Sequence, residues 1–221
     1  MNKLNYDFIE IGTSFFDTLI EKATDEQYGL SIEPVKEYLD KLPDKKFVTK
    51  IAGAVVSDED HNGLDLYYVD ESDIEKHNLG IWMAGCNSIG KPHDFHTQYT
   101  PAPALWHNDE IRPSLKTINL FDYGLVKVRK IDCFTYQQLI EKFNIGYVKL
   151  LKIDTEGYDA KILKSIIKYY DRNIDIMPTE INFESNAHSD KKEIEEVKNI
   201  LIEIGYRLEY LENGCVTRAL K

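Results

Sequence analysis

Two acidic residues stand directly after an apolar segment in the second half of the chain. The run Leu150-Leu151-Lys152-Ile153 predicts a buried strand, and Asp154 and Glu156 follow it, ahead of Gly157 and a helix. Open α/β sheets bind their ligands at the carboxyl ends of parallel strands, so these carboxylates are candidates for acid–base chemistry. The structural alternatives are a helix cap for Asp154 and a contact with the helix dipole for Glu156.

A second pattern of acid and glycine lies near the N-terminus. The run Phe8-Ile9-Glu10-Ile11-Gly12 predicts a short buried strand that enters a tight turn, and a second strand at 28–32 ends in Glu33. Glu33 follows Glu10 by 23 residues, close to the spacing of about 20 residues at which nucleotide-binding βαβ units place a ribose-binding acid. A carboxylate suits a ribose because its two oxygens accept hydrogen bonds from both hydroxyls. The alternative is a structural role at the start of the next helix.

Two histidines, His93 and His96, lie in a segment, 64–125, that shows no sustained period and is rich in proline. Connections longer than about 12–15 residues without regular structure are uncommon and often form lids or binding loops. We therefore expect a substrate-selecting insertion here. The histidine pair lacks a spaced third ligand, so it is poor evidence for a zinc site. The open alternatives are a metal site, a base or substrate contact, and ordinary loop histidines. Trp82 and Trp106 are candidates for stacking on a sugar, or for anchoring the loop to the core.

The elements that must position these residues alternate along the chain. Apolar strands are expected near 8–11, 28–32, 47–56, 147–153 and 174–183, with amphipathic helices between them. Asn213-Gly214, between two strand-like runs, is typical of a hairpin. The sequence therefore predicts an α/β fold: a Rossmann-like, doubly wound, mostly parallel seven-stranded sheet with a C-terminal antiparallel hairpin and a long irregular insertion.

Length and composition narrow the class of protein. A chain of 221 residues suits a single domain spanning 1–221 with a substantial core. A net charge of −11 disfavours a nucleic-acid partner, since phosphate binding needs a basic surface, and leaves neutral or cationic substrates. We expect no membrane span and a cytoplasmic, intracellular location, because no long apolar run or signal segment is present. The three cysteines form no C-x-x-C pair, so a zinc ribbon or a disulfide framework is not indicated.

Four segments, 8–12, 31–34, 52–58 and 151–158, together resemble the FkbM-type methyltransferases. The match covers most of the chain apart from 64–125, and the Lys-Ile-Asp and Glu-Gly pattern is its most specific element. The resemblance implies a class I methyltransferase fold, S-adenosylmethionine as methyl donor, and a hydroxyl of a sugar, a glycoconjugate or a related natural product as acceptor. The chain is expected to be either a minimal enzyme or one domain of a longer polypeptide.

The resemblance also implies a cofactor site. The methionine end of the donor would be held by the turn at Glu10, Gly12, Thr13 and Ser14. Glu33 would bind the ribose, the backbone at Gly53 and Ala54 would border the adenine, and Asp154 would face the reacting centre. Related proteins usually carry a second glycine soon after the first, where this chain has Phe15-Phe16-Asp17. We therefore expect either a displaced cofactor or contacts from Asp17 and Thr18 in place of that glycine.

Transfer of a methyl group to a hydroxyl requires removal of the hydroxyl proton, and the sequence leaves two routes open. In the first, the proton passes directly to a side chain: His93, His96, Asp154 or Glu156. In the second, a divalent cation, magnesium or manganese, acidifies the hydroxyl and is held by Asp154, Glu180 and Asn182.

Two other functions also stay open. A nicotinamide-dependent oxidoreductase would use Glu33 in the same way for a dinucleotide ribose, although the first turn lacks the G-x-G-x-x-G pattern. A catalytically inactive binding module of the same fold is suggested by the missing second glycine.

Overall fold

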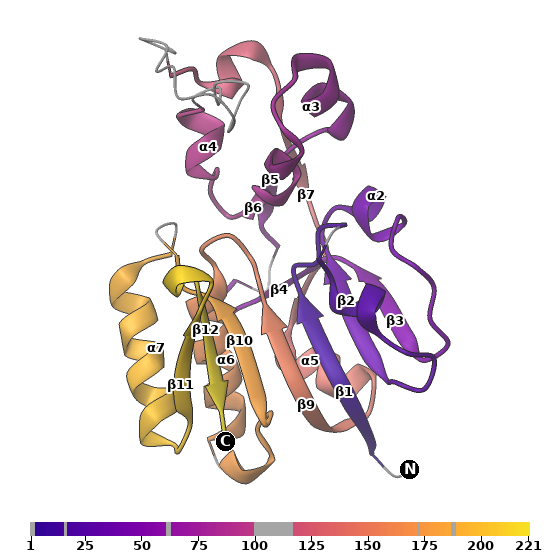
Figure 1. The fold of residues 1–221 in the computed structure, drawn as a ribbon, viewed down its shortest axis with the longest axis vertical. Coiled ribbons are helices and arrows are strands. Elements are labelled where there is room, and N and C mark those ends of the chain that lie inside the picture. The colour runs from indigo at the N-terminus through magenta and orange to yellow at the C-terminus, as the bar shows by residue number, and fades with distance from the viewer. Residues whose placement is uncertain (1–2, 16, 61–62, 100–116, 172, 187–188) are drawn as a thin grey trace. The chain divides into compact units, whose positions relative to one another are not determined.

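The computed structural model describes residues 3–15, 17–60, 63–99, 117–171, 173–186 and 189–221 (Figure 1). Trp106, a predicted stacking residue, lies outside these ranges. The chain divides into two compact units. The first unit comprises Met1–Leu64 with Lys130–Lys221, and the second unit comprises Asp65–Arg129.

The first unit is built on a 7-stranded sheet in the order β11-β12-β10-β9-β1-β2-β3. Its strands are β1 (Leu4–Ile11), β2 (Gly29–Glu33), β3 (Val48–Ala52), β9 (Ile145–Ile153), β10 (Glu180–Glu184), β11 (Arg207–Leu211) and β12 (Val216–Leu220). Neighbouring strands from β3 to β10 pair in parallel, whereas β12 is antiparallel to both β10 and β11. The predicted mostly parallel sheet with a terminal hairpin is therefore confirmed.

Helices lie on both faces of this sheet. They are α1 (Leu19–Lys22), α2 (Lys36–Leu39), α5 (Tyr136–Lys142), α6 (Asp159–Tyr170) and α7 (Lys191–Glu203), with short 3₁₀ turns η3 (Ile174–Ile176) and η4 (Glu212–Gly214). In Figure 1, α5 and α6 lie behind the sheet and α1 lies in front of it. The reason is that crossovers between parallel strands are right-handed, and the chain moves in opposite directions from β1 to β2 and from β9 to β10.

The core follows the alternation of side chains along the central strands. Ile9, Leu151 and Ile181 are fully buried in the sheet, and Ile162 and Ile166 are fully buried on the inner face of α6. The spacing of four between the two helical residues places them on one face of the helix.

The strand order reverses between β1 and β9. From β1 the chain continues to β2 and β3 on one side, and from β9 it continues to β10 on the other. Ile11 is paired with Ile153, so the two strands end at the same level. In open α/β sheets such a switch point, at the carboxyl ends of the strands, is where ligands bind.

The sequence predicts one strand over 47–56, interrupted at Gly53. The structure instead has two separate strands, β3 before Gly53 and β4 after it. β4 (Ala54–Val56) leaves the main sheet and pairs with β8 (Cys133–Thr135) in a 2-stranded parallel sheet. Gly53 has φ 149°, and a Cβ atom there would lie 2.7 Å from the carbonyl oxygen of Asp132. The absence of a side chain thus allows the segment before β8 to pass close to the backbone.

The second unit holds its own 3-stranded sheet, in the order β6-β5-β7. Its elements are β5 (Asp65–Val69), α3 (Glu71–His77), η1 (Ile81–Gly85), β6 (Ser88–Ile89), α4 (Asp94–Thr97), η2 (Leu120–Tyr123) and β7 (Val126–Lys130). Because these elements are short, the sequence shows no sustained period over them. Within the described ranges of the whole chain, no helix is long and apolar enough to cross a membrane.

Candidate active site

The loops that follow β1 and β9 touch through their backbones. Gly12 has φ 80°, and a Cβ atom on it would lie 1.8 Å from the carbonyl oxygen of Asp154. The N–H of Asp154 donates to the carbonyl of Ile11 at 2.9 Å, and that of Gly12 donates to the carbonyl of Ile32 at 2.9 Å. The structure therefore brings the predicted cofactor turn and the predicted catalytic acid together at the switch point.

Glu33, the predicted ribose ligand, connects the ends of β1 and β2. Its Oε2 accepts hydrogen bonds from the N–H groups of Thr13 at 3.2 Å and Ser14 at 2.7 Å. Its Oε1 accepts from the N–H of Val35 at 2.8 Å, and the residue is only 3% exposed. Ribose hydroxyls would have to share these oxygens with the backbone N–H groups or take the place of those N–H groups.

Glu10 is fully buried and holds the start of α1. Both of its carboxylate oxygens lie 3.0 Å from the N–H of Leu19, the first residue of the helix, and Oε1 accepts from the Lys152 ammonium at 3.1 Å. Burial raises the pKa of Glu10, and the charge of Lys152 opposes that rise. Through these contacts with Leu19 and Lys152, Glu10 positions the loop after β1.

The loop between Gly12 and α1 makes its turn without a second glycine. Ser14 has φ 51° and Asp17 has φ 55°, so two residues with side chains adopt the left-handed region. Such conformations cost about 1–3 kcal/mol each and persist where the surroundings enforce them. Here Glu33 holds Ser14, while the exposed Asp17 carboxylate forms an ion pair with Lys22 at 2.6 Å. This loop, residues 12–18, of which all but Phe16 are described, therefore depends on the side-chain contacts at Ser14 and Asp17.

Gly53 and Ala54, predicted to border the adenine, are buried beside β8. Ala54 pairs with Cys133, and the N–H of Gly53 donates to the carbonyl of Glu33 at 3.0 Å. These two residues are therefore buried next to the end of β2.

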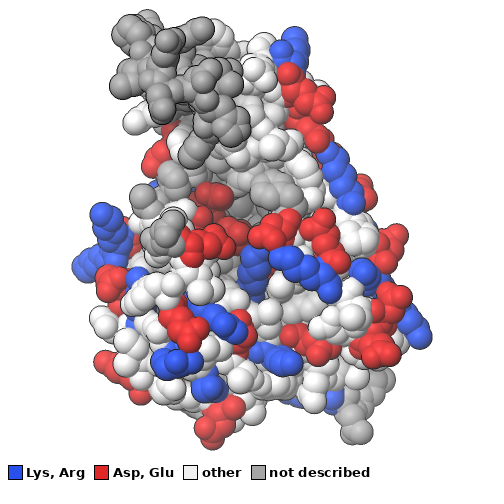
Figure 2. Space-filling view, in the orientation of Figure 1, with Lys and Arg blue, Asp and Glu red and all other residues white. Residues whose placement is uncertain are grey.

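Three carboxylates converge where β9 and β10 end. One oxygen from each of Asp154, Glu156 and Glu184 lies within 4.8 Å of the others. Oε2 of Glu184 is buried and has no hydrogen-bond partner among the described residues, whereas Oε1 accepts from the side-chain amide of Asn186. Figure 2 shows acidic side chains gathered across the face of the first unit at the strand ends. This arrangement can accept a proton or hold a hard cation.

The proximity of these acids changes their titration. Partial burial raises the pKa of the Asp154 carboxyl to about 6, although 45% of the surface of its side chain stays accessible. The charge of Glu156 adds to that rise and the charge of Lys152 opposes it. Burial, followed by the charges of Glu156, Asp159 and Asp154, raises the pKa of Glu184 well above its ordinary value.

Asp159, which the sequence analysis did not identify, joins the two strand ends. It is fully buried, and its carboxylate accepts from the hydroxyl of Thr155 at 2.8 Å and from the N–H of Glu184 at 3.2 Å. Burial raises its pKa to about 7, and the Asp154 charge adds to the rise. Its position on the first turn of α6 was the available signal.

The structure does not bring the three residues of the predicted metal set, Asp154, Glu180 and Asn182, together. Glu180 is paired in register with Leu150, four residues before Asp154, which corresponds to about 13 Å along a strand. Its carboxylate accepts from Nε of Arg218 at 2.8 Å and from Asn182 at 3.1 Å. Glu180 and Asn182 thus contact each other and Arg218, and the acids gathered with Asp154 are Glu156 and Glu184.

His93 and His96 lie in the second unit and form the N-terminal cap of α4. Nδ1 of His93 accepts from the N–H of Phe95 at 3.1 Å, and Nδ1 of His96 accepts from the N–H of His93 at 3.3 Å. Both residues are buried, and burial lowers the pKa of His96 to about 4. These contacts favour the structural interpretation, and a role as catalytic base stays a prediction.

Trp82 packs inside the second unit. Its ring lies 5.1 Å from that of Phe95 and 6.0 Å from that of Tyr99, measured between centroids, and the residue is 39% exposed. The contacts support an anchoring role and leave part of the ring accessible.

A doubly wound sheet with a glycine turn and a group of acids at its switch point is a Rossmann-like fold, a class of fold that binds its ligands at that point. The family model of the methyltransferase FkbM domain matches residues 10–208. The chain belongs to this family and is a methyltransferase. Neither the curated proteins nor the solved structures searched contain a match.

Proposed function

We propose that this protein transfers a methyl group from S-adenosylmethionine to a hydroxyl of a sugar, a glycoconjugate or a related natural product. The observation that carries the proposal is the backbone contact between Gly12 and Asp154, which brings the proposed cofactor turn next to an acidic residue at the switch point. Membership of a methyltransferase family supports the reaction class. It also argues against the nicotinamide-dependent alternative.

The charges of the acidic residues around the loop suit S-adenosylmethionine, the proposed methyl donor. S-adenosylmethionine, when bound, supplies a methyl group on a positively charged sulfur. The carboxylates of Glu10, Glu33 and Asp154 lie around the loop 12–18, and a negative environment favours a cation. Glu33 stays the proposed ribose ligand because its carboxylate lies at the end of β2, beside the turn.

Asp154 is the proposed general base. As the acceptor oxygen bonds to the methyl carbon and the carbon–sulfur bond breaks, the hydroxyl proton passes to the carboxylate. A pKa of about 6 suits this role, since a base works best when its pKa lies near the working pH. A positioned base typically contributes about 10²–10⁴-fold to the rate.

A divalent cation is a second proposed role for the same acids. Asp154, Glu156 and Glu184 would hold it, because their oxygens converge and the buried Oε2 of Glu184 lacks a partner among the described residues. Carboxylate oxygens are the ligands that magnesium and manganese prefer. The cation would supply charge that acidifies a nearby hydroxyl.

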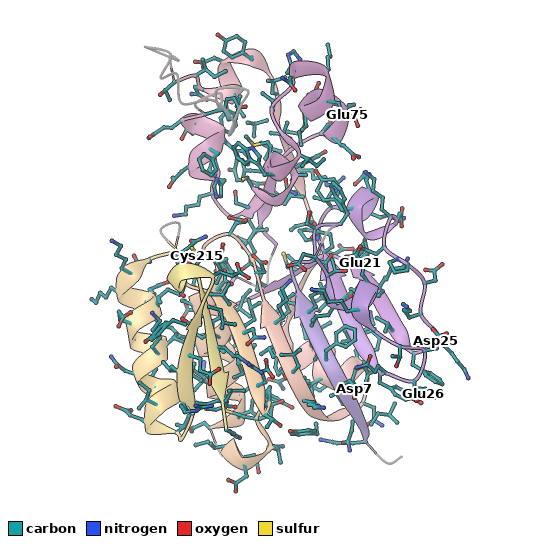
Figure 3. All side chains as sticks on the ribbon, viewed as in Figure 1. Asp7, Glu21, Asp25, Glu26, Glu75 and Cys215 are labelled. Atoms are coloured by element: carbon teal, nitrogen blue, oxygen red, sulfur yellow. The ribbon has the colours of Figure 1, made fainter. Side chains whose placement is uncertain are left out.

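Calorimetry with S-adenosylhomocysteine tests the cofactor assignment. We expect the wild type to bind, and Glu33→Ala to bind about tenfold more weakly or worse, since hydrogen bonds to charged groups are lost. Glu26→Ala is the matched control, because Glu26 is an exposed acid in the turn before β2 (Figure 3). Undiminished binding by Glu33→Ala would remove the ribose assignment.

Methyl transfer to a panel of sugars tests the reaction. Transfer to one or more of them supports the proposal. Binding of S-adenosylhomocysteine without transfer to any acceptor would favour an inactive module of the same fold.

A further inference from the structure

Lys152 of β9 lies among the acids of the proposed site. It precedes Asp154 by two residues, and side chains at i and i+2 of a strand point to the same face. It is also the register partner of Glu10 on the neighbouring strand β1. Strand pairing and strand alternation together therefore place its ammonium between these two carboxylates.

The ammonium lies near groups of three segments, two of which are 142 and 135 residues away from Lys152 in the sequence. Its Nζ lies 3.1 Å from Oε1 of Glu10, 3.3 Å from the main-chain carbonyl of Asp17 and 4.0 Å from Oδ2 of Asp154. These groups belong to the end of β1, the loop 12–18 and the segment after β9. The lysine side chain is 22% exposed and that of Glu10 is fully buried, so water screens this pair weakly.

The loop needs such a contact. It adopts two left-handed conformations at residues with side chains, Ser14 and Asp17, and Glu33 holds the first of these. Lys152 holds the second through the Asp17 carbonyl. Removing the ammonium would leave Glu10 as a buried charge without its cation, beside a carbonyl that has lost its donor.

We propose that Lys152 is a positioning residue for cofactor binding. Its ammonium joins Glu10, the Asp17 carbonyl and Asp154, and so holds the loop 12–18 in the shape that receives the methionine end of S-adenosylmethionine. This inference rests on the proposed function. It adds that the charge next to the donor's sulfur is set by a lysine as well as by acids.

Calorimetry with S-adenosylhomocysteine and S-adenosylmethionine tests the proposal. Lys152→Met should weaken binding of S-adenosylhomocysteine about tenfold or more, because charge-assisted hydrogen bonds are lost. Lys152→Arg keeps the charge and should recover most of the affinity. Lys149→Met is the matched control, since Lys149 is an exposed lysine on the same strand, and it should bind like the wild type.

The two ligands separate positioning by charge from a purely structural role. S-adenosylmethionine carries a sulfonium charge that S-adenosylhomocysteine lacks. Loss of a nearby ammonium should therefore raise the preference for S-adenosylmethionine about threefold or more in Lys152→Met. The preference should stay at the wild-type value in Lys152→Arg. An unchanged preference in Lys152→Met would overturn the proposal.

A double variant keeps the test decisive if Lys152→Met fails to fold. Glu10→Gln with Lys152→Met removes both charges, and the amide oxygen can still accept from the N–H of Leu19. We expect a folded protein that binds S-adenosylhomocysteine weakly, and wild-type affinity would overturn the proposal. A wild type that binds neither ligand would instead contradict the proposed function.

Discussion

Gly12 and Asp154 are in direct backbone contact, since a Cβ atom on Gly12 would lie 1.8 Å from the carbonyl oxygen of Asp154. The contact joins the ends of β1 and β9, the two adjacent strands between which the strand order reverses. The turn proposed to receive the donor and the residue proposed to take the proton are therefore in contact through their main chains. A side chain added at Gly12 would therefore also displace the backbone of Asp154.

Gly12→Ala should destabilise the protein strongly. The new methyl group would meet backbone at 1.8 Å, and the residue would also keep a positive φ of 80°. The left-handed conformation alone costs about 1–2 kcal/mol, and the clash adds to it. Gly205→Ala is the control, because Gly205 has a φ of 99° and nothing within 4 Å of the added atom. Urea denaturation should show a clearly larger loss for Gly12→Ala, and equal losses would contradict the observed contact.

Asp154→Asn should abolish most methyl transfer and leave binding of S-adenosylhomocysteine near the wild-type value. The amide cannot take a proton, so we expect a rate loss of about 10²–10⁴-fold. In the wild type the base works in its ionised form and its pKa is about 6, so activity should rise as the pH increases through 6 and level off above it. A rate that does not change between pH 5 and pH 8 would contradict the assignment.

Chelation separates the two routes for the hydroxyl proton. Activity that survives EDTA excludes the cation route and leaves direct transfer of the proton to a side chain, for which Asp154 is the proposed base. Activity that is lost and restored by manganese supports the cation role. In the second case Glu184→Gln should weaken manganese binding, measured by calorimetry, because it removes one carboxylate of the cluster. Glu180→Gln should not, since Glu180 contacts Arg218 and Asn182 instead. Equal losses in both variants would contradict the proposed set of ligands, Asp154, Glu156 and Glu184.

Acid should destabilise the second unit through His96. Burial lowers the pKa of this imidazole to about 4, below the unfolded value of about 6.5, so the fold favours the neutral form. The stability from this group is fully present above pH 6.5 and is lost as the pH falls toward 4, with about 2 kcal/mol lost by pH 5.

His96→Asn tests this prediction, since the amide oxygen can still accept from the N–H of His93. The variant should lose less stability than the wild type between pH 7 and pH 5 in chemical denaturation. His77→Asn, at an exposed position on α3, is the control and should follow the wild type.

The cysteines give no sign of a structural disulfide among the described residues. Cys86, Cys133 and Cys215 are all free thiols, and Cys215, labelled in Figure 3, is exposed beside the turn between β11 and β12. This agrees with the absence of a paired cysteine pattern in the sequence.

The sequence by itself determined the main sheet, its hairpin and the strand ends at which the candidate site lies. Alternation of apolar residues within each strand, the glycine after β1 and the acids after β9 are local signals, readable over a few residues. They were sufficient to place Gly12 and Asp154 at neighbouring strand ends. The short elements of the second unit gave no such signal, because none is long enough to show a period.

Only the tertiary structure decided which side chains meet. Glu180, Asn182 and Glu184 alternate along one strand, and only the pairing of β10 with β9 shows that Glu184 is level with Asp154. The contacts of Lys152 with Glu10, and of Glu33 with the loop 12–18, likewise depend on the register between strands far apart in sequence. Local periodicity determines the face to which a side chain points, whereas its partner is determined by how the strands align.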